Sequence, residues 1–316
     1  MIRKVSNFLL VEVFDNSVPV EVFGRSFGIF YNLKMVSIFS NNVSALNYYA
    51  AWLHGLSFGG VLGAFLAKNE DVNFSTQLFR LKVTDLKSGD KDAVLDVVEV
   101  TEIKTEILKT CILLMFLITC CFHVYYYTDG YGTGSYTQQL NLGRNAYRWF
   151  EYGITSTLMI FVLSIMSGVK NVDMVYTLCA ANLVLMSLGY FIEMLPEKKS
   201  KVICLCTGFY LLASIWYVIL SNFYRRISEV EDIDNPNVPG GKREVAGWVK
   251  QVLVPMFLWY LSFGVVALFY VRNYDKPGFD FRVYERYYII LSYLSKAFMG
   301  YYLAFGLTRP KNKDAA

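Results

Sequence analysis

Seven stretches of this chain are long and apolar enough to cross a lipid bilayer. A membrane-spanning helix needs about 20 mostly apolar residues. The stretches cover 45–67, 110–128, 149–169, 174–192, 202–224, 251–271 and 287–308 of a 316-residue chain. Because backbone polar groups find no water in the hydrocarbon, each stretch has to satisfy its own hydrogen bonds as a helix. The sequence therefore predicts an all-α membrane protein with a seven-transmembrane-helix bundle.

The composition agrees with a membrane location and argues against several other classes of protein. Hydrophobic residues make up 55% of the chain and charged residues only 18%, which is more apolar surface than a soluble domain can bury. The net charge is +4, and the basic residues are scattered, so no nucleic-acid-binding patch is expected. The six cysteines fall within or beside the apolar stretches without metal-ligand spacing, which favours buried apolar side chains and no metal site.

The segments outside the spans divide the chain into three parts. We expect an N-terminal extension at 1–43, a seven-helix domain at 44–310 and a short tail at 311–316. The long connection 68–109 contains two alternating segments, "TQLFRLKVTDL" and "AVLDVVEVTEI", around the turn residues "KSGDKD". Alternation around a Gly-Asp turn predicts a β-hairpin over one mouth of the bundle. The later segment "DGYGTGSYTQQLNLG" is expected to be a glycine-rich loop.

The seventh apolar stretch carries one charged residue, Lys296, close to its middle. A lysine at the centre of a bilayer costs about 2.5–3.5 kcal/mol on insertion scales. Its side chain cannot easily reach either interface, which lies two to three helical turns away. We therefore expect Lys296 to face the bundle interior and to be paired, neutral or covalently modified.

Glu151 is the only other charged residue that lies comparably deep within the predicted spans. One interpretation is a structural Lys–Glu clamp between two helices, although desolvation of a buried pair can exceed its Coulomb energy. The other interpretation is a lysine that forms a Schiff base with an aldehyde. Burial favours the nucleophilic amine, and Glu151 would then be the counterion of the protonated Schiff base formed on Lys296.

An aldehyde long enough to need a membrane bundle is retinal. Its polyene would require a slot lined by aromatic side chains, and the fifth and sixth spans supply these residues. The candidates are Trp216, Tyr217, Phe257, Trp259, Tyr260 and Phe263. Aromatic residues at helical spacing also serve simply to pack helices together, and that alternative remains open for each of them.

Polar residues near the two charges favour a functional site. Ser292 precedes Lys296 by four residues and so lies on the same helix face, and Thr155 stands one turn from Glu151. The two histidines of the chain, His54 and His123, both fall within predicted spans. Intramembrane histidines either make packing hydrogen bonds or handle protons.

Two motifs resemble those of heliorhodopsins, a distant branch of seven-helix retinal proteins. "RWFEYGITSTLM" resembles the third-helix Arg-Trp-x-Glu-Tyr pattern, and "SYLSK" resembles the pattern around the retinal lysine. The resemblance covers roughly 44–308. It implies that Lys296 is the attachment site and Glu151 the counterion, with Ser292 as a hydrogen-bonding neighbour of the lysine. It also places His54, His123, Asn47 and Thr119 around the Schiff base.

The resemblance also implies an orientation, a cofactor and partners. The N-terminus would be cytoplasmic, and the C-terminus and the hairpin extracellular, which the distribution of basic residues does not decide. The cofactor would be all-trans retinal, and the protein a homodimer in lipid that signals through an unidentified partner. After Glu151 the third span lacks the second carboxylate of outward proton pumps, which favours a sensory or regulatory photoreceptor.

Two other functions remain as alternatives. A light-gated proton channel would need protonatable groups leading to both faces, and Asp173, Glu193 and Glu285 lie near helix ends, where carboxylates are usually solvated. A membrane enzyme based on a lysine would want a cleft open to water. Two histidines cannot build a three-histidine zinc site, and we expect no enzymatic activity.

Overall fold

The computed structural model describes residues 42–67, 75–83, 95–129, 134–232, 250 and 252–307. Almost all of the expected N-terminal extension, the expected hairpin turn and the expected C-terminal tail lie outside these residues. The chain divides into two units, Met1–Asn42 and Val43–Ala316, and the architecture below is that of the second unit.

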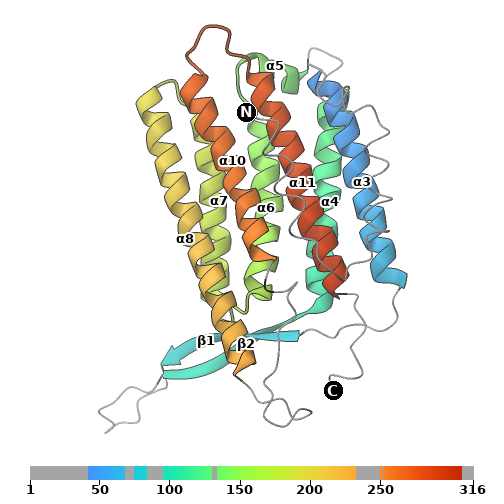
Figure 1. The fold of residues 1–316 in the computed structure, drawn as a ribbon, viewed down its shortest axis with the longest axis vertical. Helices are drawn as coiled ribbons and strands as arrows, with labels where there is room; N and C mark the ends of the chain where they lie inside the picture. The colour runs from blue at the N-terminus through green and yellow to red at the C-terminus, as the bar shows by residue number, and fades with distance from the viewer. Residues whose placement is uncertain are drawn as a thin grey trace. The chain divides into compact units, whose positions relative to one another are not determined.

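In the described part of the chain, seven long helices form a closed ring, which can be followed in Figure 1. They are α3 (Val43–Ala67), α4 (Thr105–Asp129), α6 (Ala146–Met166), α7 (Val172–Met194), α8 (Lys198–Glu231), α10 (Leu253–Asn273) and α11 (Phe281–Leu307). Each helix packs against the next one, and α11 packs against α3 to close the ring. The short helix α5 (Ser135–Asn141) lies at one end of the bundle, which we call the α5 end.

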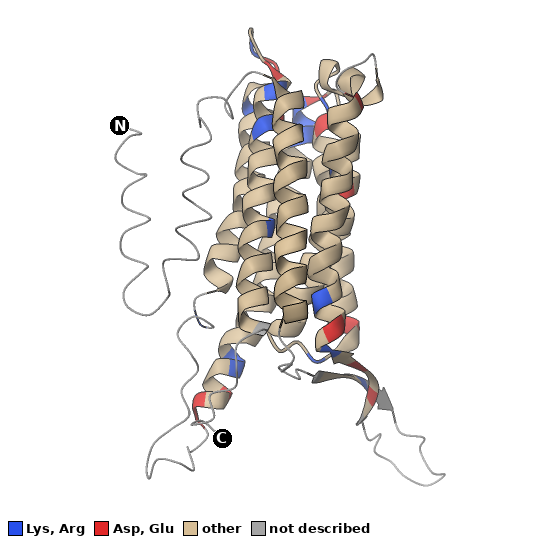
Figure 2. Ribbon diagram, turned by 90° about the vertical axis from the view of Figure 1, so that its right-hand side faces the viewer, with Lys and Arg blue, Asp and Glu red and all other residues tan. Residues whose placement is uncertain are grey.

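Six of the helices in the described part of the chain are long and apolar enough to cross a membrane. The remaining one, α11, is less apolar because it carries Arg282, Glu285, Arg286 and Lys296. α11 has 27 residues, and at a rise of about 1.5 Å per residue the helix is longer than the roughly 30 Å of a bilayer core. Figure 2 shows the charged residues gathered mainly at the two ends of the bundle. The prediction of a seven-helix bundle is confirmed, with helix ends that differ by several residues from those expected.

Two local features differ from the expectation. α6 stops at Met166, three residues before the expected end, and Gly168 then turns the chain with φ +79°, a conformation that glycine adopts without steric cost. The segment expected to be a glycine-rich loop contains α5, whose residues Tyr136 and Leu140 are buried against the bundle.

The predicted hairpin is present at the other end of the bundle, which we call the hairpin end (Figure 1). β1 (Ser75–Val83) pairs antiparallel with β2 (Leu95–Lys104), from Ser75 opposite Lys104 to Val83 opposite Leu95, with a bulge between Leu78 and Phe79. The backbone N–H of Phe79 donates to the carbonyl of Lys170 at 2.8 Å. Arg80 also forms an exposed ion pair with Asp173 at 2.6 Å. The hairpin is thus attached to the segment joining α6 and α7, through Lys170, and to the first turn of α7, through Asp173.

The two halves of the bundle have different interiors. Toward the hairpin end the fully buried side chains are mostly apolar, among them Leu108, Ile112, Met115, Phe116, Ile160, Leu163 and Met299. Toward the α5 end the buried residues include charged ones, namely Arg148, Glu193, Lys201 and Glu285. The centre of the bundle therefore lies between an apolar half and a half that contains buried charged residues.

Candidate functional site

The two deeply placed charges of the sequence meet at the centre of the bundle. Lys296 of α11 and Glu151 of α6 form an ion pair with Nζ 2.7 Å from Oε1, and both are buried, at 3% and 2% exposure. α6 begins at Ala146, with the side chain of Asn145 capping its first turn by accepting from the Arg148 N–H at 3.1 Å. This cap fixes where the helix begins and so which face of α6 carries Glu151.

Further hydrogen bonds surround the ion pair. The hydroxyl of Thr119 donates to Glu151 Oε1 at 2.6 Å, and that of Thr155 donates to the same atom at 3.1 Å. On the other side, Lys296 Nζ donates to Ser292 Oγ at 2.8 Å, and it also lies 5.0 Å from the centre of the Tyr152 ring. A buried pair is tolerated when its remaining hydrogen-bonding capacity is satisfied in this way. The site is therefore built to keep a positive nitrogen and a carboxylate together.

The two histidines lie beside this pair as a stacked couple. Their ring centres are 5.5 Å apart with an interplanar angle of 12°. His123 Nδ1 is 2.8 Å from Asn47 Oδ1, whereas His123 Nε2 and both nitrogens of His54 have no protein partner within the described residues. Buried polar nitrogens need hydrogen-bond partners, and ordered water is one that could serve them. Asn47 therefore fixes one histidine and leaves the other nitrogens available for proton exchange.

A chain of hydrogen bonds leads from the histidines to the α5 end. Asn47 Nδ2 donates to the Tyr136 hydroxyl at 3.0 Å, and that hydroxyl donates to Glu285 Oε1 at 3.2 Å. Burial raises the pKa of Tyr136, so its hydroxyl keeps its proton and acts as a donor. Asn145 Nδ2 donates to the same oxygen of Glu285 at 2.7 Å. The chain thus connects His123, near the centre, with a carboxylate close to the end of the bundle.

Arg148 lies between two carboxylates at the α5 end. Its guanidinium is ion-paired with both Glu193 and Glu285, and all three side chains are buried. The interpretation of these two carboxylates as solvated helix ends is therefore wrong, although it holds for Asp173, whose side chain is 56% exposed. Sequence inspection missed this cluster, even though Arg148 precedes Glu151 by three residues and so shares its helix face.

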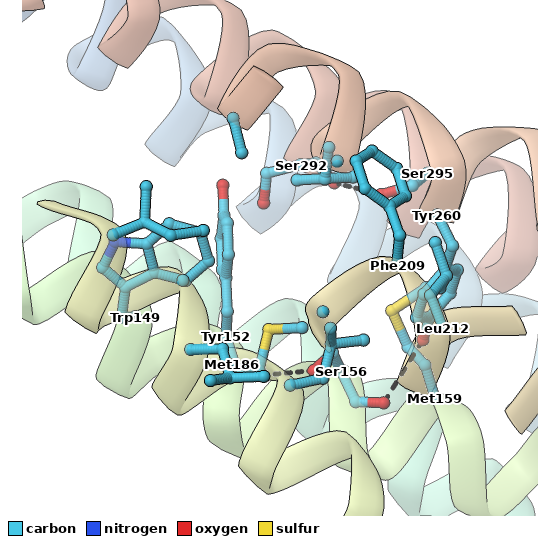
Figure 3. A pocket seen from close by; sticks show the side chains of 18 of the residues that line it. Trp149, Tyr152, Ser156, Met159, Met186, Phe209, Leu212, Tyr260, Ser292 and Ser295 are labelled. Atoms are coloured by element: carbon cyan, nitrogen blue, oxygen red, sulfur yellow. Dashed lines mark hydrogen bonds between the residues drawn. The ribbon is translucent and has the colours of Figure 1, made fainter. Parts of the chain in front are cut away.

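A cavity lies between α6, α7, α8, α10 and α11, and Lys296 is among the residues that line it. Figure 3 shows lining side chains, including Tyr152, Met186 and Ser292. Its apolar walls include Met159, Leu185, Met186, Leu188, Gly189, Ile192, Leu205, Gly208, Phe209, Leu212, Gly264 and Ala267. Aromatic side chains contribute Trp149, Tyr152, Tyr260 and Phe263, and polar ones Thr155, Ser156, Ser292, Ser295 and Lys296. The cavity therefore combines the Lys296 amine with walls that are mostly apolar and aromatic.

The structure separates the aromatic candidates into two groups. Phe263 and Tyr260 line the cavity, whereas Trp216 and Trp259 are not among its lining residues. Trp216 is fully buried one layer behind, with its ring edge-to-face against Tyr260 at 5.4 Å between ring centres. Sequence inspection did not select Trp149, which lies in the motif around Glu151 and lines the cavity.

Trp149 packs directly over Gly189 of α7. A Cβ atom at position 189 would collide with the six-membered ring of Trp149. Trp149 also lies edge-to-face against Tyr288 at 5.7 Å between ring centres, and the Arg148 guanidinium is 5.2 Å from its ring. One wall of the cavity thus depends on a glycine that lets an indole approach the α7 backbone.

Comparison with known families and proteins identifies the class of the chain. The heliorhodopsin family model matches residues 43–307, which is most of the chain, and the chain therefore belongs to the heliorhodopsin family. This finding confirms the resemblance drawn from the two motifs. A search of curated proteins found no similar sequence.

A solved structure supports the same fold. The bundle is similar to the crystal structure of a light-driven proton pump, LR (Mac), from Leptosphaeria maculans, with a TM-score of 0.53 and 11% sequence identity. The similarity covers 84% of this chain and 95% of that one. At this identity it establishes the fold alone. Family and fold together make this an integral multi-pass membrane protein of the retinal-binding kind.

The contact between Trp149 and Gly189 gives a first prediction. Gly189→Ala should push the indole into the cavity, so less pigment forms when retinal is added, or the absorption maximum shifts. Gly153→Ala is the matched control, because its added Cβ would meet only Leu183 at 3.8 Å, an ordinary contact. Absorption spectra normalised to folded protein measure both effects. Equal spectra for the two variants would contradict this account of the cavity wall.

Proposed function

We propose that this chain is a light sensor in which retinal is bound through Lys296 and balanced by Glu151. The observation that carries the proposal is the buried ion pair of these residues, whose lysine lines an apolar cavity. A plain Lys–Glu clamp would not need such a cavity beside its amine. The residues fit the group, because a retinal site requires an amine, a counter-charge and apolar walls.

Retinal, when joined to Lys296 Nζ by a C=N bond formed with loss of water, supplies absorption of visible light and a change of shape by isomerisation. Glu151 stabilises the positive charge on the lysine nitrogen. Thr119 and Thr155 hold the carboxylate in place through their hydroxyl protons, and Ser292 offers the nitrogen a second acceptor. Phe263, together with Tyr260, forms part of the wall, while Trp216 supports that wall from behind.

We assign proton handling to the histidine couple. In this proposal, His123 and His54 receive the proton of the lysine nitrogen after light absorption, because their ring nitrogens that lack a partner among the described residues are buried beside the ion pair. The hydrogen-bonded chain through Asn47 and Tyr136 then leads toward the α5 end only. Proton movement to one side stores a signal without carrying charge across the membrane, and we therefore favour a sensory or regulatory role over a pump.

The proposal also includes an orientation and partners, which family membership supports. We place residues 1–43 and the α5 end in the cytoplasm, and the hairpin and the C-terminal tail outside. We also propose a homodimer with all-trans retinal in the dark, signalling through a further protein. Within this arrangement, 44–310 is the retinal-binding domain and 68–109 its extracellular loop.

The first experiment compares two buried lysines. Lys296→Ala should abolish pigment formation when all-trans retinal is added to membranes that contain the protein. Lys201→Met is the control, because Lys201 is equally buried but donates instead to the Ile192 carbonyl at 2.5 Å, outside the cavity lining. We expect the control to retain a visible absorption band. A band that survives Lys296→Ala would refute the attachment site.

A second experiment tests the counterion. Glu151→Gln should red-shift the visible band, because a neutral amide stabilises the positive nitrogen less in the ground state than a carboxylate does. Glu193→Gln removes another buried carboxylate that pairs with Arg148 rather than with Lys296, so its band should move much less. If Glu151→Gln left the absorption maximum unchanged, Glu151 would not be the counterion.

A light-gated proton channel is the second candidate function. It is favoured by the hydrogen-bonded chain from His123 to Glu285, which reaches the α5 end of the bundle. It is disfavoured by the opposite half, where no buried charged residue occurs among the described residues.

Voltage-clamp recording distinguishes the two functions. In cells that express the protein with retinal, the sensor predicts no steady light-induced current at any membrane voltage. The physical reason is that, among the described residues, the hairpin half contains no buried charged group that could bind a proton on its way across. A steady current that reverses with the proton gradient would replace the sensor by the channel.

A further inference from the structure

The hairpin side of Lys296 is occupied by one aromatic ring. Gly300 follows Lys296 by four residues and so lies on the same face of α11, one turn closer to the hairpin end. Phe116 of α4 packs over Gly300, where an added Cβ atom would collide with the phenyl ring. Phe116 is itself completely buried, at 0% exposure. The phenyl ring of Phe116 therefore lies one helical turn from Lys296, on the side that faces the hairpin end.

Phe116 also lies between two polar groups. Its ring centre is 6.0 Å from that of His54 and 6.3 Å from that of Tyr301. His54 belongs to the histidine couple beside the ion pair, whereas Tyr301 is 38% exposed and stands further along α11 toward the hairpin end. The ring thus borders both the proton-handling site and a more exposed hydroxyl.

Hydroxyl groups continue beyond Phe116 along the seam between α3 and α11. The Tyr301 hydroxyl donates to Ser57 Oγ at 2.9 Å, and Tyr293 also hydrogen-bonds with Ser57. Ser57 follows His54 by three residues on α3, and the ring of Tyr293 stands edge-on to His54 at 5.3 Å between ring centres. These three hydroxyl residues form a polar route toward the hairpin end that is broken at His54, because Tyr293 meets His54 through a ring contact and both His54 nitrogens lack a hydrogen-bond partner among the described residues.

We propose that Phe116, seated on Gly300, is the apolar seal that separates the Lys296–Glu151–His54 site from the Ser57–Tyr301 hydroxyls. The proposal rests on the proposed retinal-binding function and assigns the residue that makes proton exchange one-sided. Without the phenyl ring, the hydroxyls of Ser57 and Tyr301 and the free nitrogens of His54 would face a common space. Several polar partners in one space are what a buried water requires.

Two substitutions at the seal separate the loss of bulk from the loss of an aromatic ring. Phe116→Ser empties the position and adds a hydroxyl, so water should enter and connect the two polar groups. Phe116→Leu keeps an apolar side chain there and should remain tight. Phe150→Ser is the surface control, because Phe150 belongs to α6 but is 64% exposed on the outside of the bundle.

Proton permeability of liposomes is the measurement. Each protein is reconstituted with retinal, a pH gradient is imposed, and its decay is followed in the dark and in green light with a trapped pH dye. We expect Phe116→Ser to raise the dark proton leak on the order of tenfold or more, since each tenfold in rate needs only a small lowering of the barrier. Wild type, Phe116→Leu and Phe150→Ser should remain equally tight. A leak of Phe116→Ser no greater than that of wild type, or an equal leak of Phe150→Ser, would overturn the proposal.

A second variant tests the role of Phe116 as a seal if Phe116→Ser does not fold. Gly300→Ala leaves Phe116 in the chain but displaces its ring, and it should also raise the dark leak. A folded Gly300→Ala protein as tight as wild type would contradict the seal. The visible spectrum of the same samples tests the retinal site separately, because the dark leak needs no light and a missing pigment would count only against the proposed photoreceptor.

Discussion

The buried ion pair between Lys296 and Glu151 governs the organisation of the bundle interior. Taking two charges out of water is costly, and removing one partner of such a pair leaves an uncompensated charge that destabilises the fold strongly. The surrounding residues satisfy this requirement: two threonine hydroxyls donate to Glu151, and Ser292 accepts from the lysine. An arrangement of this kind holds the lysine nitrogen and its counter-charge at a fixed position, directly beside the apolar cavity. The proposed attachment of retinal would use both features at once.

The same pair also marks a boundary between two environments. Toward the α5 end, asparagine, tyrosine and glutamate side chains connect the histidine couple with the cluster in which Arg148 bridges Glu193 and Glu285. Toward the hairpin end, Phe116 and the apolar side chains around it fill the interior. Buried charged groups among the described residues therefore continue from the lysine nitrogen toward the α5 end and not toward the hairpin end. This asymmetry supports the proposed sensory role and the proposed function of Phe116 as a seal.

The sequence predicted the fold, the central pair and the polar residues around it, but not the Arg148 cluster or most of the cavity wall. Seven apolar stretches, the alternating hairpin and the two deep charges are local patterns, and each is visible without knowledge of how the helices pack. The burial of Glu193 and Glu285 depends on Arg148 from a different helix, and a carboxylate near a helix end carries no mark of such a partner. The cavity was equally hidden: Trp149 and Gly189 shape it through a contact between two helices, whereas Trp259, chosen from an aromatic run, is not among the residues that line it.

The most direct test of the central claim is to identify the lysine that carries the chromophore. Reduction of the retinal-bound protein with borohydride converts the C=N bond into a stable amine, and peptide mass spectrometry then locates the modified residue. The account predicts a single retinyl group on the peptide that contains Lys296, with Lys201 and the surface lysines unmodified. A retinyl group on another lysine, or none at all in a protein that shows a visible band, would contradict it.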